Sequence, residues 1–406
     1  MRKDFRITRR RWLGAGAALG AGLTACKNSA PVPEAGPSQL GKPVSAYGER
    51  SPFETAARML PDSHYLTESD SFTPLQDSSG ILTPSALHYE RHHAGVPQID
   101  PARHRLLIHG MVDRPLMFTM DDIRRLPSVS RILFVECSGN SGFEWGGGLL
   151  PDIPHNTAQS HGLVSCSEWT GVPLAVLLAE TGLQKQAKWL MAEGADACKM
   201  QRSLPVEKAD DMLVAWGQNG EALRPEQGYP LRLIVPGWEG NVNIKWLRRI
   251  MAADQPYMGR EETSKYTDLM PDGTARMFTF VMEAKSLITF PSGGQKLAGP
   301  GFYEITGLAW SGRGIIERVE VSTDGGRNWR DTGLQEPRLP MAFTRFRLPW
   351  TWDGGESVLQ SRCTDETGYV QPSREALLAL RGRNSGYHFN GIKAWKVMAD
   401  RSVVSA

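Results

Sequence analysis

Residues 132–140 read ILFVECSGN, and most of what the sequence predicts starts from this stretch. The apolar run before Glu136 is typical of a buried strand, and the Ser-Gly-Asn that follows Cys137 is typical of a tight turn. A thiolate at a strand end, facing the N–H groups of such a turn, can be a nucleophile or a ligand for a soft metal. A cysteine in this place can also be a small buried apolar residue. The rest of the chain has to decide between these roles.

Charge and cysteine content exclude several classes of protein. The 406 residues include 46 Lys and Arg against 44 Asp and Glu, interspersed, so the sequence predicts no nucleic-acid partner. The cysteines form neither a CxxC pair nor an even framework; they are Cys26, Cys137, Cys166, Cys198 and Cys363. Because no CxxCH is present, the sequence predicts no covalently bound haem, and a redox enzyme with this sequence would pass its electrons to a partner.

Residues 1–26 have the layout of a twin-arginine export signal. Residues 8–13 read TRRRWL, and a weakly apolar run rich in Gly and Ala follows. This route exports folded proteins, which favours a cofactor inserted before export and predicts a periplasmic location. Residues 23–26 read LTAC and are similar to a lipoprotein box. Acylation of Cys26 and soluble release therefore both stay open.

Composition predicts three regions after the signal. Residues 27–79 are rich in Pro, Ser, Gly and Thr and indicate a tether, or an arm that wraps another surface. Residues 80–275 mix strand and helix patterns, with a strand at 105–110, short helices at 120–126 and 173–180, and a proline-bounded strand at 229–236. We therefore expect an α+β catalytic domain there.

Residues 276–400 have a different texture. Short alternating runs at 303–310 and 316–322 are separated by turn signals, and the DGGR of 324–327 indicates a hairpin tip. Helical periodicity returns only near 375–381. This pattern predicts an immunoglobulin-like β-sandwich, a module that usually mediates association.

Two further segments of the predicted catalytic domain offer donors to an anion. Residues 89–93 read YERHH, and residues 235–246 read VPGWEGNVNIKW, a glycine-rich loop that ends in a lysine. Arg232 lies on the strand before this loop, and Asp196 lies in a turn of small residues. Each feature alone fits an ordinary surface or loop residue. Together they favour a phosphate-bearing cofactor.

Taken together, these segments resemble the sulfite oxidase family of molybdenum-cofactor enzymes. Its Arg-x-His, Cys-x-Gly-Asn and Gly-x-x-x-x-Lys-Trp motifs occur here in family order, from about residue 82 to 397 with the sandwich domain. The resemblance implies a Mo-molybdopterin cofactor with Cys137 as the metal ligand, and a catalytic set of Cys137, Arg91 and Tyr266. The implied cofactor contacts are Tyr89, Arg91, His93, Cys137, Asp196, Gln227, Arg232, Asn243, Ile244 and Lys245.

Departures from the family pattern bear on the substrate. Ser141 and Gly142 stand where sulfite-oxidising members have two arginines, Asn241 and Val242 replace an Ala-Arg pair, and Gln227 replaces a histidine. A small dianion such as sulfite needs fixed cationic donors. Their loss favours a bulkier, less charged sulfur carried on another molecule.

Residues 160–174, 308–314 and 365–372 are similar to one branch of the family, the molybdenum subunits of sulfane dehydrogenases of the Sox thiosulfate-oxidising system. This resemblance implies oxidation of sulfane sulfur bound to a carrier-protein cysteine, with electrons passed to a dihaem c-type cytochrome subunit. It also implies a homodimer through the sandwich within a heterotetramer. A free-sulfite dehydrogenase and a metal-free binding scaffold remain the alternatives.

Overall fold

The structure is a computed structural model that describes residues 41–61, 69–146 and 156–406. The predicted export signal and Cys26 lie outside the described residues. The chain divides into residues 1–54 and 55–406. In the first unit, residues 41–54 form turns and extended chain, and every helix and strand named below belongs to the second unit.

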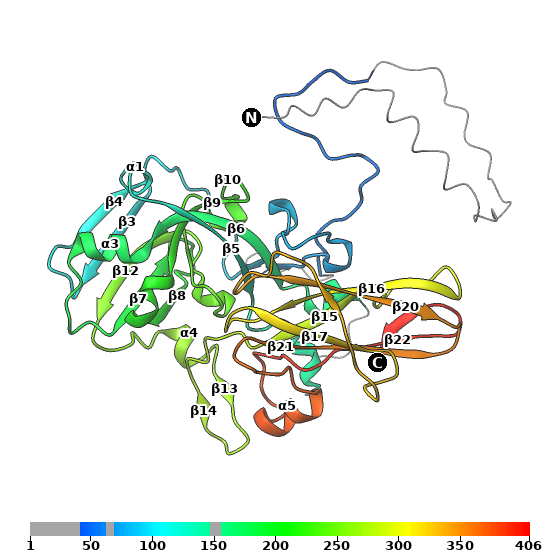
Figure 1. Ribbon diagram of the computed structural model, residues 1–406. Helices are drawn as coiled ribbons and strands as arrows, with labels where there is room; N and C mark the ends of the chain where they lie inside the picture. Colours follow the sequence, from blue (N-terminus) through cyan, green and yellow to red (C-terminus); the bar gives the residue numbers. More distant parts are fainter. Residues whose placement is uncertain (1–40, 62–68, 147–155) are drawn as a thin grey trace, which may run out of the picture. The chain divides into compact units, whose positions relative to one another are not determined.

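Two five-stranded sheets frame the first domain (Figure 1). One has the order β4-β3-β12-β7-β8, in which only β3 and β12 are parallel. Its strands are β3 (Arg105–Gly110), β4 (Leu116–Thr119), β7 (Trp189–Gly194), β8 (Gln201–Pro205) and β12 (Leu247–Ala253). The other, antiparallel, has the order β10-β9-β6-β5, with β11 also on β9. Its strands are β5 (Val129–Glu136), β6 (Val164–Pro173), β9 (Leu213–Gln218), β10 (Glu221–Ala222) and β11 (Arg232–Ile234).

Helices in the described residues are few and short, and local signals bound them. They are α1 (Met120–Arg124), α2 (Thr157–His161), α3 (Leu174–Thr181), α4 (Arg260–Thr263) and α5 (Arg374–Arg381). Thr119 and Asp122 form a capping box at the start of α1. Gly182, with φ 69°, ends α3 in the left-handed conformation that glycine adopts readily. None of the described helices is long and apolar enough to cross a membrane.

The second domain is a sandwich of two sheets, with orders β15-β16-β20-β19 and β18-β17-β21-β22-β23. The first sheet contains β15 (Lys285–Phe290), β16 (Gly301–Trp310), β19 (Gly333–Leu334) and β20 (Thr344–Trp352). The second contains β17 (Ile316–Ser322), β18 (Arg330–Asp331), β21 (Ser357–Asp365), β22 (Ala394–Val397) and β23 (Val403–Ser405). The predicted hairpin tip joins β17 to β18, with Gly325 and Gly326 at φ 75° and 87°. The fold class predicted from the sequence is confirmed.

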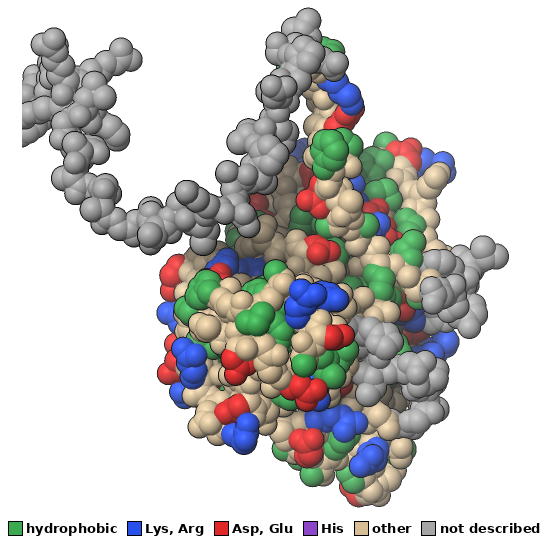
Figure 2. Space-filling model, turned by 90° about the vertical axis from the view of Figure 1, so that its right-hand side faces the viewer, with side chains coloured by type: hydrophobic (Ala, Val, Ile, Leu, Met, Phe, Trp, Pro, Cys, Tyr) green, Lys and Arg blue, Asp and Glu red, His purple; other side chains and the backbone are tan. Residues whose placement is uncertain are grey.

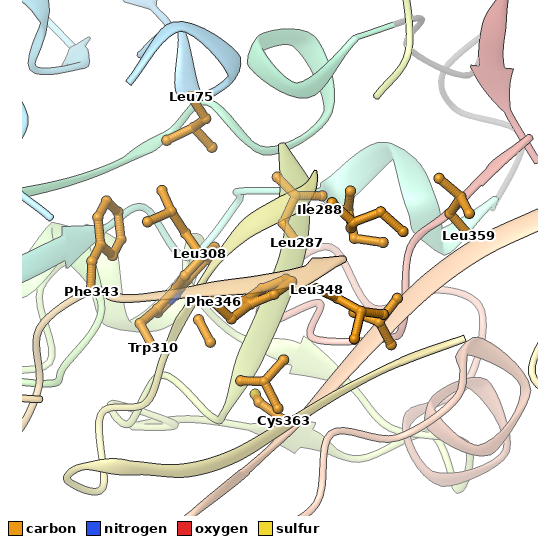
Figure 3. Close-up of a cluster of buried hydrophobic side chains, with 14 of the residues drawn as sticks. Leu75, Leu287, Ile288, Leu308, Trp310, Phe343, Phe346, Leu348, Leu359 and Cys363 are labelled. Carbon is orange, nitrogen blue, oxygen red and sulfur yellow. The ribbon is translucent and has the colours of Figure 1, made fainter. Parts of the chain in front are cut away.

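The two domains share one apolar core. Side chains from both sandwich sheets, including Leu308, Phe346 and Leu359, pack with Phe134 of β5 and Cys166 of β6. Figure 3 shows Leu75 facing this cluster from outside the sandwich. Burial of this continuous surface holds the domains together, because apolar area removed from water stabilises by about 25 cal/mol per Å².

Residues 69–79, the end of the segment predicted as a tether, are packed into this unit. β1 (Ser69–Ser71) pairs with β2 (Glu90–His92), and Leu75 is fully buried. The pairing supports the segment that carries Arg91 and His93. A second hairpin, β13 (Asp268–Leu269) with β14 (Ala275–Arg276), lies beside α5 (Figure 1). On the face in Figure 2, basic and acidic side chains are interspersed.

Candidate cofactor site

Cys137 follows the last residue of β5 and is held by a short network of hydrogen bonds. Its N–H donates to the Leu163 carbonyl at 2.9 Å, and its carbonyl accepts from the Asn140 N–H at 2.9 Å. The Asn140 side chain donates to Glu136 Oε1 and accepts from the Leu163 N–H. The strand-end turn predicted from the sequence is therefore present, and it leaves the thiol partly exposed.

Desolvation controls the charge of the Cys137 thiol. Although the residue is partly exposed, the surrounding protein removes most water from the sulfur and raises its pKa to about 11, while the Gly139 N–H and Arg91 act in the opposite direction. The free thiol is thus protonated at neutral pH. A metal that binds here must displace this proton, because the thiolate is the ligand.

Gly240 lets the glycine-rich loop pack directly onto Cys137. A Cβ at this position would lie 2.9 Å from the Glu136 carbonyl oxygen and 3.1 Å from the Cys137 Cα. The Asn243 side chain ties the loop together, because it accepts from the Val235 N–H and donates to the Glu239 carbonyl. Gly240 therefore permits the close approach of the loop to Cys137, while loop N–H groups such as those of Val242 and Asn243 already donate to backbone carbonyls.

The structure brings all the sequence-predicted site residues to one cavity of about 670 Å³. Cys137 lies on its wall, together with the predicted cofactor contacts. These are Tyr89, Arg91, His93, Asp196, Gln227, Arg232, Asn243, Ile244 and Lys245, with Tyr266 beside them. Segments far apart in the sequence, from β2 to the start of β13, thus converge on one space.

Two cations at the cavity suit an anionic group. Lys245 Nζ donates to the carbonyls of Arg91 and Glu226 and contacts His92 Nδ1 at 2.8 Å. Arg232 donates to the carbonyls of Gln227 and Asn243, and its buried Nε has no hydrogen-bond partner among the described residues. In the described part of the chain neither cation forms an ion pair with a carboxylate. A phosphate-bearing cofactor bound here would supply the missing negative charge.

The same burial lowers the pKa of both cations. Burial, followed by repulsion from Arg232, lowers the pKa of Lys245 to about 7. Burial lowers the pKa of Arg232 to about 10. An anion bound between them would favour their charged forms.

Anion binding by the cofactor-free chain should therefore weaken as pH rises through about 7. Below this pH Lys245 is already cationic, whereas above it the lysine must first take up a proton. Sulfate is a suitable probe because its charge does not change in this range. We expect sulfate to raise the melting temperature severalfold more at about pH 6 than at about pH 8.5. Lys245→Met should remove this difference, and an unchanged pH dependence in that variant would contradict the assignment.

A second cavity, of about 1500 Å³, lies on the other side of Cys137. It shares Cys137, Arg91, His93 and Tyr266 with the first cavity, so the two spaces adjoin at these four residues. The Tyr266 hydroxyl lies 3.0 Å from His93 Nε2. Burial raises the pKa of Tyr266, so its phenol stays protonated and can donate a hydrogen bond.

Several residues that line these cavities or contact their lining had no motif to reveal them. Arg202 of β8 lies 5.2 Å from the ring centroid of Tyr266 and pairs with Glu239 and Glu262. Tyr387, from the loop after α5, lies against Tyr266 in a tilted contact. His92 was visible only as a neighbour of Arg91 and His93. It bridges Glu90 and Lys245, which orients the lysine.

Comparison with known proteins shows which family has this fold and this site. A family model for the oxidoreductase molybdopterin binding domain matches residues 93–261, and one for the Mo-co oxidoreductase dimerisation domain matches residues 276–394. The solved structure of the sulfane dehydrogenase SoxCD from Paracoccus pantotrophus is similar, with a TM-score of 0.88 and 48% sequence identity. The match covers 91% of this chain and 96% of that one. The chain belongs to the sulfite oxidase family.

Nitrate reductases are also similar to this chain, at lower sequence identity. The NADH nitrate reductase of Solanum lycopersicum is 29% identical over 349 residues, which are 73% of this chain and 36% of that protein. The NADPH nitrate reductase of Phytophthora infestans is 31% identical over 318 residues, 70% of this chain and 34% of that protein. The chain spans about a third of the length of these relatives.

The departures from the family pattern have distinct structural places. Gly142 borders the second cavity, whereas Ser141 is buried with φ 63°. Gln227 donates to the Tyr89 carbonyl at 2.9 Å and lies 3.4 Å from Arg232 Nη1. It therefore holds the cavity wall as well as bordering the cavity.

Proposed function

We propose that this chain is the molybdenum subunit of a periplasmic sulfane dehydrogenase. Its substrate would be sulfane sulfur bound to a carrier-protein cysteine, and its electron acceptor a dihaem c-type cytochrome. The proposal is carried by the extensive likeness to sulfane dehydrogenase SoxCD. The second cavity supports it, because about 1500 Å³ of space that opens to solvent beside Cys137 leaves room for more than a free sulfite ion.

Glycines and small residues contribute to the width of this second cavity. Gly139, Gly142, Gly146 and Gly386 all border it. A peptide arm can enter such a space with its backbone extended, because glycine walls allow close approach. Gly142 replaces one of the arginines that the family's sulfite-oxidising members present, so the cysteine motif contributes no cationic side chain to this wall.

The residues divide into those that hold the cofactor and those that meet the substrate. When bound, the molybdenum cofactor supplies two-electron oxygen-atom transfer. Cys137 would ligate its metal, while Arg232 and Lys245 would hold its phosphate. Arg91 would stabilise negative charge on the oxidised sulfur, and Tyr266 would donate a hydrogen bond beside it.

One oxidation step balances as R–S–S⁻ + H₂O → R–S–SO⁻ + 2H⁺ + 2e⁻, where R is the carrier protein. The terminal sulfur gains one oxygen atom derived from water, and no sulfur–sulfur bond breaks. The two electrons leave the chain for the haem partner. A homodimer through the sandwich domain, within a heterotetramer with that partner, completes the proposal.

Substrate competition tests the proposal directly. The purified chain with its cytochrome should reduce the haem with the sulfane-loaded carrier at least ~100-fold more efficiently, in kcat/KM, than with free sulfite. An unloaded carrier is the control. Preference for sulfite would favour the free-sulfite dehydrogenase instead. A purified chain that contains no molybdenum and reduces no haem with either substrate would favour the metal-free scaffold.

A further inference from the structure

The cysteine loop, defined here as residues 136–146, contains Cys137 and borders the second cavity. In the first domain it begins at the last residue of β5, which runs toward the sandwich in Figure 1. Many of the hydrogen bonds that hold the cysteine loop in place come from the second domain. Side chains or backbone groups of Lys285, Trp310, Arg374, His388 and Lys393 contact it.

Glu136, directly before Cys137, is locked between two sandwich strands. Its Oε1 accepts from Lys285 Nζ at 2.6 Å and its Oε2 accepts from Trp310 Nε1 at 2.7 Å. Lys285 begins β15 and Trp310 ends β16. The exposed fractions of Glu136, Lys285 and Trp310 are 0%, 1% and 0%, so water does not compete for these bonds.

The loop is fixed on the other side of Cys137 as well. The His388 N–H donates to the Ser138 carbonyl at 2.8 Å. Arg374 Nε donates to the Glu144 carbonyl at 2.7 Å, and Lys393 Nζ donates to Glu144 Oε1 at 2.6 Å. The second domain therefore holds the loop at three points, one before the cysteine and two after it.

Energetics favour a geometric role for the buried pair. Burying Glu136 and Lys285 costs desolvation that their attraction only partly offsets, so a matched apolar pair could stabilise the fold equally well. Hydrogen bonds at both carboxylate oxygens fix the orientation of the Glu136 side chain as well as its distance from its partners, whereas an apolar contact fixes no orientation. Glu136 is adjacent to Cys137 in the chain, so a shift of the Glu136 backbone also moves the Cys137 thiol.

We propose that Glu136 and Lys285, together with Trp310, are positioning residues through which the β-sandwich domain sets Cys137 for metal binding. The sandwich would then have two roles, because it would support the cofactor site and also mediate association. This inference rests on the proposed role of Cys137 as the molybdenum ligand.

The test uses three variants of the full chain that nearly preserve shape: Lys285→Met, Glu136→Gln and the double variant. Each is produced with its cofactor, and its melting temperature, molybdenum content and Mo(V) electron paramagnetic resonance signal are measured. Removing a group that orients a metal ligand costs about 10–100-fold in metal affinity or activity. We expect both single variants to lose metal and to show a shifted signal.

The double variant separates positioning from stability. It removes the unpaired buried charge, so we expect its melting temperature to recover toward that of the unchanged chain while its signal stays shifted. Recovery of both would mean that the pair only stabilises the fold, and the proposal would fall. An unchanged signal in all three variants would overturn it too.

Glu320→Gln is the matched control. Glu320 accepts from Arg362 at 2.8 Å and 3.2 Å within the sandwich, and it is also mostly buried. The Glu320→Gln variant should have the same molybdenum content and the same Mo(V) signal as the unchanged chain. A signal shift in this control equal to that of Lys285→Met would show general destabilisation, and would also overturn the proposal.

Hydrogen exchange of residues 138–144 in the cofactor-free chain gives a readout independent of the metal. Exchange should be faster in Lys285→Met and in the double variant, and unchanged in Glu320→Gln. If the unchanged chain lacks molybdenum, the proposed function fails while this readout still tests the positioning. If it holds molybdenum but exchange and signal are unaffected by the variants, only the positioning inference fails.

Discussion

Replacing Cys137 by Ser should reduce haem reduction by more than about 1,000-fold and leave little molybdenum on the chain. Changes to groups that only orient a metal ligand already cost about 10–100-fold, and here the ligand itself is removed. A serine hydroxyl is a much weaker acid than a thiol and a harder ligand, so it does not replace a thiolate. The fold should persist, because Ser is nearly the same size and Cys137 is partly exposed.

Cys166→Ala is the control for this result. Cys166 is a fully buried free thiol in the core shared by the two domains. Its truncation should cost about 1 kcal/mol of stability and leave metal content per folded chain unchanged. Full turnover and full metal content in Cys137→Ser would disprove the ligand assignment.

Replacing Arg91 by Met should lower kcat by about 100- to 1,000-fold with a smaller change in KM, as removal of a fixed donor to developing negative charge does elsewhere. Arg91 lies where the two cavities adjoin, and its Nε is 3.3 Å from Asp70 Oδ1. The carboxylate keeps the guanidinium in place there. Steady-state haem reduction with the sulfane-loaded carrier measures both constants.

Arg131→Met is the matched control for Arg91. Arg131 is on β5, is similarly exposed, and donates to Asp211 Oδ1 at 2.8 Å. Neither Arg131 nor Asp211 lines either cavity. Its replacement should leave kcat unchanged. A rise in KM alone in Arg91→Met would assign Arg91 to substrate binding and contradict a role in stabilising the oxidised sulfur.

Local patterns predicted the elements that carry the site. The apolar run before Cys137 is β5, and the helix pattern that ends at Gly182 is α3, because strand alternation and glycine caps act within a few residues. The cofactor contacts could be named because their motifs lie in short, separate segments. Their common cavity then follows from the fold.

Long-range polar pairs could not be predicted in this way. Lys285 is separated from Glu136 by 149 residues, and a lysine at the start of an alternating strand normally faces water. Arg202 carries no motif, yet it lies against Tyr266. Residues 69–79 have too few apolar residues for a periodic signal, but Phe72 and Leu75 are buried on surfaces that other segments provide.

The sequence by itself determined the residue types that the proposed chemistry needs: a thiol at a strand end, cations suited to a phosphate, and glycine where sulfite-oxidising relatives have an arginine. These are properties of residue type and short spacing. The tertiary structure decided which domain holds the thiol and how much space lies beside it. Both depend on contacts between distant segments, where burial turns a pair such as Glu136 and Lys285 from solvated charges into a fixed geometric support.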